Sequence, residues 1–160
     1  MSIVVRLVEE HDLPVLREHQ ARPDLNLVDV HFEASADGTM LFVAAFEDDQ
    51  PLGTALLDVT EDYQWAPELR NMWVYPEARR RGAGRALSQW IEDEARNRGF
   101  EAVYLAVDPN NEKAIPLYIS LGYSPTGEHL LVDDPEVPQV DASIQPAEYY
   151  AIYKKSLSAH

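Results

Sequence analysis

The residues best suited to chemistry gather in one short stretch of the sequence, where arginines flank two glycines. Four of the 13 basic residues lie within seven positions, and they are Arg79, Arg80, Arg81 and Arg85. Gly82 and Gly84 lie among them, where a segment with helical periodicity begins. Glycines let backbone N–H groups approach an anion, a helix start adds partial positive charge, and arginine supplies forked donors for phosphate oxygens. The stretch predicts an anion site suited to a pyrophosphate, although the glycines alone would also fit an ordinary tight turn.

Three classes of phosphate-binding site could occupy this stretch. A P-loop needs Gly-x-x-x-x-Gly-Lys-Ser/Thr, which the sequence lacks. A dinucleotide fingerprint needs a third glycine where Leu87 stands, and Glu101, at about the right distance from Gly82, precedes the next expected strand instead of ending it. Coenzyme A, whose pyrophosphate lies across one helix start, is the third possibility and the one that the residues contradict least.

Residues 66–124 resemble the cofactor-binding half of the GNAT superfamily of acyl-CoA-dependent N-acetyltransferases. The family signature Gln/Arg-x-x-Gly-x-Gly/Ala is matched by Arg79, Gly82 and Gly84, and the block from Met72 to Glu77 resembles the family's fourth strand and its exit. A later family block is matched by Asn111, Ala114, Leu117, Tyr118, Leu121, Gly122 and Tyr123. The resemblance covers a little over a third of the chain at motif level.

The resemblance implies acetyl-CoA as co-substrate, bound where the fourth and fifth strands splay apart. Backbone groups of the fourth strand would hold the pantetheine arm, and N–H groups of the arginine loop would hold the pyrophosphate. The implied cofactor-binding residues are Met72, Trp73, Val74, Arg79, Arg80, Arg81, Gly82, Ala83, Gly84, Arg85 and Asn111. Asn111 would contact the cofactor or only cap a helix.

Two residues are the implied catalysts of this family's chemistry. Tyr118 matches the tyrosine that protonates the departing thiolate, although a tyrosine on an amphipathic helix can also be a core residue. Glu68 matches the place where some members carry a base; it would need burial to raise its pKa, and it could equally be a polar residue at a strand start. Asp58 and Asp133 are weaker candidates for the base.

The resemblance implies direct, sequential transfer to a primary amine whose identity is open. The contacts to this acceptor are expected from residues 19–36 and from the loop 132–147. Both segments carry acids that favour a cationic acceptor, and these are Asp24, Asp29, Glu33, Asp133, Asp134 and Glu136. The alternative is a non-catalytic acyl-CoA-binding regulatory protein, which would need neither Tyr118 nor a base. A nicotinamide dinucleotide enzyme is disfavoured by the missing glycine.

The hydrophobic pattern predicts the elements that position these residues. We expect strands at 3–8, 40–46, 52–59, 69–74 and 102–107, with two more around the acidic loop, and helices from Leu13, over 84–98 and from about 111 to 121. Residues 47–51 should form the turn of a hairpin between the second and third strands, and residues 19–36 should be irregular or weakly helical, with Pro23 interrupting. Asp12 should cap the first helix, Gly99 and Gly122 should end the later two, and Pro116 should delay or kink the last. This order predicts one α/β domain over 1–160, GNAT-like, with a mixed six- to seven-stranded sheet and helices on both faces.

The composition indicates which classes of partner and which cellular compartment to expect. The chain has 160 residues, 46% of them hydrophobic, and a net charge of −15, which disfavours nucleic acid and anionic membranes. With no cysteine and five scattered histidines, we expect no metal site and no thiol nucleophile. No membrane span or signal peptide is recognisable, so we expect a cytoplasmic monomer or homodimer.

Overall fold

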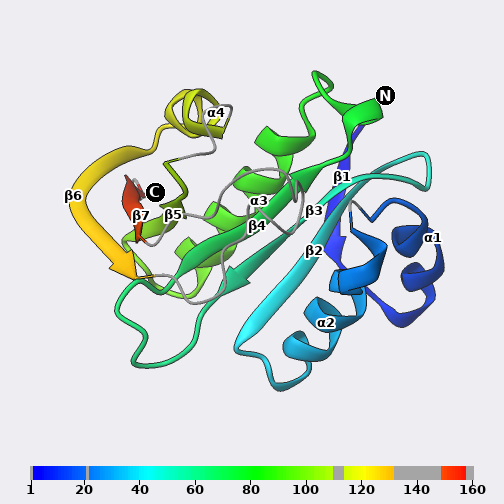
Figure 1. Cartoon of the computed structure of the whole chain (residues 1–160), viewed down its shortest axis with the longest axis horizontal. Coiled ribbons are helices and arrows are strands. Elements are labelled where there is room, and N and C mark those ends of the chain that lie inside the picture. The colour runs from blue at the N-terminus through cyan, green and yellow to red at the C-terminus, as the bar shows by residue number, and fades with distance from the viewer. Residues whose placement is uncertain (1, 21, 110–113, 132–148, 158–160) are drawn as a thin grey trace.

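The computed structural model describes residues 2–20, 22–109, 114–131 and 149–157, and its centre is one mixed sheet (Figure 1). Seven strands lie in the order β1-β2-β3-β4-β5-β7-β6, and all neighbours are antiparallel except β4 and β5. The strands are β1 (Val4–Leu7), β2 (Met40–Glu47), β3 (Gln50–Asp58), β4 (Glu68–Val74), β5 (Ala102–Val107), β6 (Ser124–Leu131) and β7 (Tyr149–Ser156). The predicted fold class is confirmed.

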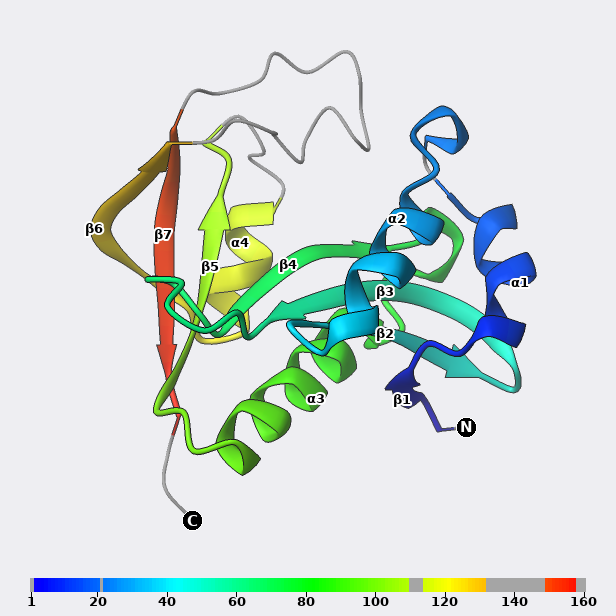
Figure 2. The same cartoon turned by 90° about the horizontal axis from the view of Figure 1, so that it is seen from below.

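Helices cover both faces of this sheet, as the sequence predicts (Figure 2). The helices are α1 (Leu13–Glu18), α2 (Leu27–Ala34), α3 (Ala83–Asn97) and α4 (Ala114–Ser120). The first two pack on Phe42, Ala44 and Leu56, while α3 and α4 pack on the opposite face in a second core cluster. No helix in the described ranges is long and apolar enough to cross a membrane.

The β2–β3 hairpin separates the two cores because its side chains alternate. Phe42 faces α1 and α2, whereas Val43 faces α3, as the period of two along a strand requires. Asp48 and Asp49 form the turn with φ of 50° and 69°, the left-handed pair that matches the twist of a tight hairpin. The predicted hairpin is confirmed with a two-residue turn.

Helix α3 joins the parallel strands β4 and β5 and ends where its sequence predicts. Ala83, Leu87, Ile91 and Ala95 form its buried stripe. Gly99 has a φ of 88° and donates its N–H to the Arg96 carbonyl, while Phe100 donates to Ala95. This is a Schellman cap, with Phe100 packed back on the core.

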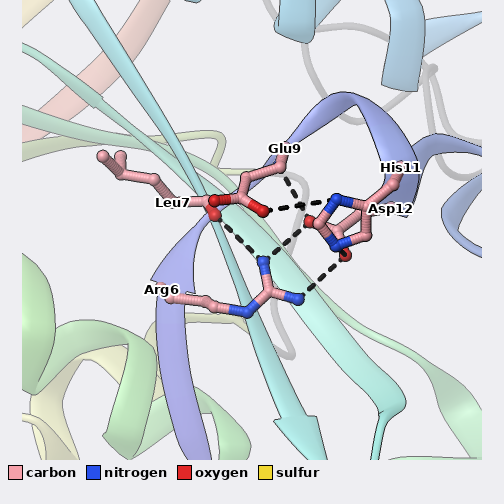
Figure 3. A network of polar contacts seen from close by, with 5 residues as sticks. All are labelled: Arg6, Leu7, Glu9, His11 and Asp12. Atoms are coloured by element: carbon pink, nitrogen blue, oxygen red, sulfur yellow. Dashed lines mark hydrogen bonds and ion pairs between the residues drawn. The ribbon is translucent and has the colours of Figure 1, made fainter.

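The start of the chain departs from the prediction at Asp12. Its carboxylate makes no cap hydrogen bond to α1; it accepts the Arg6 guanidinium at 2.7 and 2.8 Å and the Glu9 N–H at 2.8 Å (Figure 3). Arg6 thereby holds the pKa of Asp12 below its usual range. Possible ligand atoms of Glu9, His11 and Asp12 lie within 4.8 Å of one another, but both Asp12 oxygens are engaged by Arg6. The cluster is an ion-pair network that ties β1 to α1.

Residues 19–36, expected to be irregular or weakly helical, contain a defined helix. A 3₁₀ turn at Pro23–Leu25 is followed by α2. Asn26 joins them with a left-handed φ of 52°, a conformation that asparagine tolerates well. Pro23 therefore interrupts the segment as predicted, but it does not prevent the helix that follows.

Candidate active site

The parallel strands β4 and β5 meet at one end and part at the other. Their register contains one pair, Glu68 with Tyr104, and the Tyr104 N–H donates to the Pro67 carbonyl at 3.0 Å. Beyond this pair, no described strand lies against the β5-facing edge of β4. Backbone polar groups need partners, so this edge offers hydrogen bonds to an extended ligand arm.

A bulge shapes β4 where the splay opens. Thr54 and Leu56 of β3 pair with Trp73 and Arg70, so that two residues of β4, Asn71 and Met72, oppose a single residue of β3. Asn71 has a left-handed φ of 51°, which turns the backbone at this point. The predicted pantetheine-binding residues, Met72 to Val74, follow this turn directly.

Gly53 on β3 is a residue that sequence analysis missed. A Cβ there would lie 2.6 Å from the Trp73 carbonyl oxygen and 2.9 Å from the Val74 Cα. Glycine therefore allows β3 to press against the segment of β4 that faces the splay. A glycine inside an expected strand is a signal of close backbone approach, although it does not say to which strand.

The arginine loop follows β4 and leads directly into α3. After a 3₁₀ turn at Pro76–Ala78, Arg80 and Gly82 take left-handed φ of 67° and 91°. Gly82 is the N-cap of α3, and no side chain caps the helix start. Such a turn before a helix presents backbone N–H groups as an anion-binding concavity. A Cβ on Gly84 would meet Val74 at 3.7 Å, an ordinary contact, so packing within the protein does not itself require glycine there.

The charges of this loop differ from those of the rest of the molecule. The six arginines outside it are all ion-paired, and they are Arg6, Arg17, Arg22, Arg70, Arg96 and Arg98. Among the described residues, the exposed side chains of Arg80, Arg81 and Arg85 face no carboxylate partner. In a protein of net charge −15, free guanidinium groups at a helix start favour a bound anion.

Arg79 is oriented differently from the other loop arginines. Its Nε donates to the Val74 carbonyl at 3.3 Å, and its guanidinium lies 5.0 Å from the centre of the Trp73 ring. This cation–π contact joins the start of the loop to the end of β4. Arg79 therefore holds the loop against the strand, whereas Arg80, Arg81 and Arg85 are exposed.

Tyr118 lies on α4, half-buried against the core cluster that includes α3. In the described part of α4, Pro116 is the third residue. The expected start of this helix, at about residue 111, lies outside the described residues. Asn111 and Asp133 lie outside the described residues.

Glu68 is buried at the point where the strands part. Its side chain is 4% exposed, accepts the Tyr63 hydroxyl at 2.8 Å, and lies 3.8 Å from Arg70 Nε. Burial raises the pKa of Glu68, while Arg70 and Tyr63 act in the opposite direction. Glu68 thus has the burial and the raised pKa that a base at this position would need. Because it is buried, it would act through a water or through Tyr63.

The neighbours of Glu68 come from segments far apart in sequence. Asp58 pairs with it across β3 and β4 and contacts Arg70 at 3.3 Å. His31 of α2 packs edge to face on Phe42 at 5.6 Å, and burial and then the charge of Arg70 lower its pKa to about 4. The expected contact of residues 19–36 with the acceptor stays a prediction.

An aromatic pair lies beside Glu68 on the β5 side, opposite Asp58 of β3. The ring of Tyr104, which pairs with Glu68, meets Trp65 edge to face at 5.5 Å and has Lys154 Nζ 6.0 Å from its centre. None of these aromatic residues was predicted from the sequence. Strand register brings Tyr104 to Glu68, whereas the loop before β4 places Tyr63 against Glu68 and Trp65 against Tyr104.

Splayed parallel strands beside an uncapped helix start with free arginines are the layout expected of the acyltransferase class that the sequence resembles. Comparison with known proteins is more specific. The sequence model of the Acetyltransferase (GNAT) family matches residues 6–123, and the chain belongs to this family.

Individual relatives agree with this assignment. The chain is 32% identical over 105 residues to "Probable N-acetyltransferase 14" of Xenopus tropicalis, covering 66% of this chain and 50% of the relative. It is 43% identical over 56 residues to the ribosomal protein bS18-alanine N-acetyltransferase of Escherichia coli K12, covering 35% of this chain and 38% of that enzyme. The chain thus spans at most about half the length of these relatives.

A solved structure shares the fold at low identity. The PaiA N-acetyltransferase of Thermoplasma acidophilum, in complex with coenzyme A, superposes with a TM-score of 0.68 at 18% identity. The similarity covers 98% of this chain and 99% of that structure.

Proposed function

We propose that this protein transfers the acetyl group of acetyl-CoA to a primary amine by direct sequential transfer. The observation that carries the proposal is the loop whose arginines find no described carboxylate, placed between the unpaired edge of β4 and the uncapped start of α3. A pyrophosphate at the loop and an extended arm along β4 would satisfy both features. The family membership and the coenzyme A complex of the Thermoplasma structure support the same ligand.

Different residues would act on the thioester and on the amine, from the two sides of the gap between β4 and β5. Acetyl-CoA supplies an activated thioester when bound. Backbone N–H groups at Trp73 and Val74 would polarise its carbonyl, and Tyr118 would give a proton to the departing thiolate. On the other side, Glu68 would take the proton of the amine through a water or the Tyr63 hydroxyl, which donates to it at 2.8 Å.

The overall charge of the protein supports a cationic acceptor better than do the individual acidic residues expected to contact it. The net charge of −15 attracts cations. Asp24 and Asp29, however, are already paired with Arg22 and Arg17 at 2.7 and 2.6 Å. The aromatic pair Trp65 and Tyr104 beside buried Glu68 is therefore the better candidate for contacting an alkylammonium group.

The test combines binding with transfer. Acetyl-CoA at about a hundredfold its Kd should stabilise the protein by roughly 2.7 kcal/mol, whereas NADH should not. Thioester loss should then be followed with a peptide beginning in alanine, spermidine and a lysine peptide. Binding without transfer to any amine would favour the regulatory acyl-CoA-binding alternative, and no binding would refute both.

A further inference from the structure

An ion pair with one buried partner lies beneath the carboxyl end of α4 and has no role in the chemistry proposed so far. Glu92 of α3 is 2% exposed, and its Oε1 lies 2.9 Å from Nζ of Lys155 on β7, whose side chain is 28% exposed. The Glu92 Oε2 accepts the Ser88 hydroxyl at 2.7 Å. Removing the Glu92 carboxylate from water has a desolvation cost that offsets much of its attraction to Lys155. Stability alone is therefore a weak explanation for this pair.

The lysine of the pair also binds the backbone at the end of α4. Its Nζ donates to the Leu121 carbonyl at 2.7 Å, one of the carbonyls that a helix end leaves without an internal partner. Its stem crosses Gly122 so closely that a Cβ there would lie 3.0 Å from Lys155 Cε. Gly122 also has a φ of 101°, so the turn is fixed by both its backbone and the lysine.

This turn is bonded directly to Tyr118. The Tyr118 carbonyl accepts the N–H of Leu121 at 3.2 Å and that of Tyr123 at 3.0 Å. Tyr123 is itself 2% exposed and anchors the turn in the core. A shift of the Leu121 carbonyl would therefore rotate the last turn of α4, which carries the Tyr118 ring.

We propose that the Glu92–Lys155 pair is a positioning device for Tyr118: by holding the Leu121 carbonyl, it sets the direction in which the phenol points. The inference rests on the proposed role of Tyr118 as proton donor. Glu92 and Lys155 act through the helix and do not touch the reacting atoms. The device joins three elements, α3, β7 and α4, that no local sequence pattern connects.

The key variant replaces both partners, Glu92→Leu with Lys155→Met, so that no orphan charge remains buried. Glu94→Leu with Arg98→Met is the matched control, because it removes another ion pair of α3, Arg98 Nε to Glu94 Oε2 at 2.9 Å, which takes no part in the proposed site. Each protein is measured for acetyl-CoA affinity, for single-turnover transfer to the most reactive amine of the panel, and for hydrogen exchange at the Tyr123 amide. If the double variant does not fold, Glu92→Gln keeps the shape of the pair and weakens its charge.

We expect the pair variant to transfer acetyl at least about tenfold more slowly, because misplacing a catalytic group by 1 Å has effects of this size or larger. Acetyl-CoA affinity should stay within about twofold, Tyr123 should exchange faster, and the control should match the wild type. Combined with Tyr118→Phe, the pair change should slow transfer no further, since there is no phenol left to orient.

The outcomes separate the two ideas. A slow Tyr118→Phe variant together with an unaffected pair variant would overturn the positioning inference alone, as would an equal loss in both backgrounds. A Tyr118→Phe variant with the wild-type rate would overturn the proton-donor role and the positioning inference with it.

Discussion

Gly53→Ala tests whether the contact between β3 and β4 shapes the proposed cofactor site. The added Cβ would lie 2.6 Å from the Trp73 oxygen, and ordinary contact begins at 3.4 Å, so the strands must move apart by about 0.8 Å. Overpacking of this kind costs roughly 1–3 kcal/mol, and each kcal/mol lowers the Tm of a domain of this size by about 2–4 °C. The displaced backbone is the segment proposed to bind the pantetheine arm, so we expect acetyl-CoA affinity to fall about tenfold, or roughly 1.4 kcal/mol.

The assay pairs thermal unfolding with a titration followed by tryptophan fluorescence, since Trp73 lies in the affected segment. Gly84→Ala is the control for stability, because its Cβ meets Val74 at an ordinary 3.7 Å; we expect its Tm to be unchanged or slightly higher. A folded Gly53→Ala protein with wild-type Tm and affinity would show that the strands adjust freely and that the close approach has no bearing on binding.

Three further predictions concern the loop, the acid and α2. Arg81→Glu should weaken acetyl-CoA binding at low salt far more than Arg96→Glu, because Arg81 faces no described carboxylate whereas Arg96 is paired with Asp93; equal losses would refute the anion site. Tyr118→Phe should slow single-turnover transfer by roughly 10²-fold with acetyl-CoA affinity unchanged, and an unaltered rate would exclude it as the acid. His31 has its pKa lowered to about 4 by burial and Arg70, so its contribution to stability is present above about pH 6.5 and lost as the pH falls towards 4, by up to roughly 3 kcal/mol. His31→Gln should therefore flatten the fall in Tm over this range, and an unchanged slope would contradict the assignment.

The elements that sequence analysis predicted well are those specified by neighbouring residues. The β2–β3 hairpin follows from alternation around a polar turn, and α3 follows from a buried stripe that ends at Gly99. The arginine loop is of the same kind, because its glycines and charges are adjacent in sequence. Local patterns therefore predicted the fold class and the position of the arginine loop before α3, where the anion site is proposed.

The features that sequence analysis missed or misjudged depend on residues far apart along the chain. Asp12 looks like a helix cap, yet Arg6 competes successfully for its carboxylate. The approach of Gly53 to β4 depends on strand register, and the pairing of Glu92 with Lys155 depends on how a helix lies over a strand. No spacing rule along one sequence encodes these contacts, because tertiary packing determines them.

The single register pair between β4 and β5 also affects how stable the sheet is when no ligand is bound. The sheet is strongly laddered on either side of this junction, but across it only Glu68 and Tyr104 are in register. A bound pantetheine arm would act as a surrogate strand and complete the missing ladder. We therefore expect β5, β7 and β6 to open as one cooperative unit when ligand is removed, so that coenzyme A depletion, more than heat, would expose this half of the molecule to proteases.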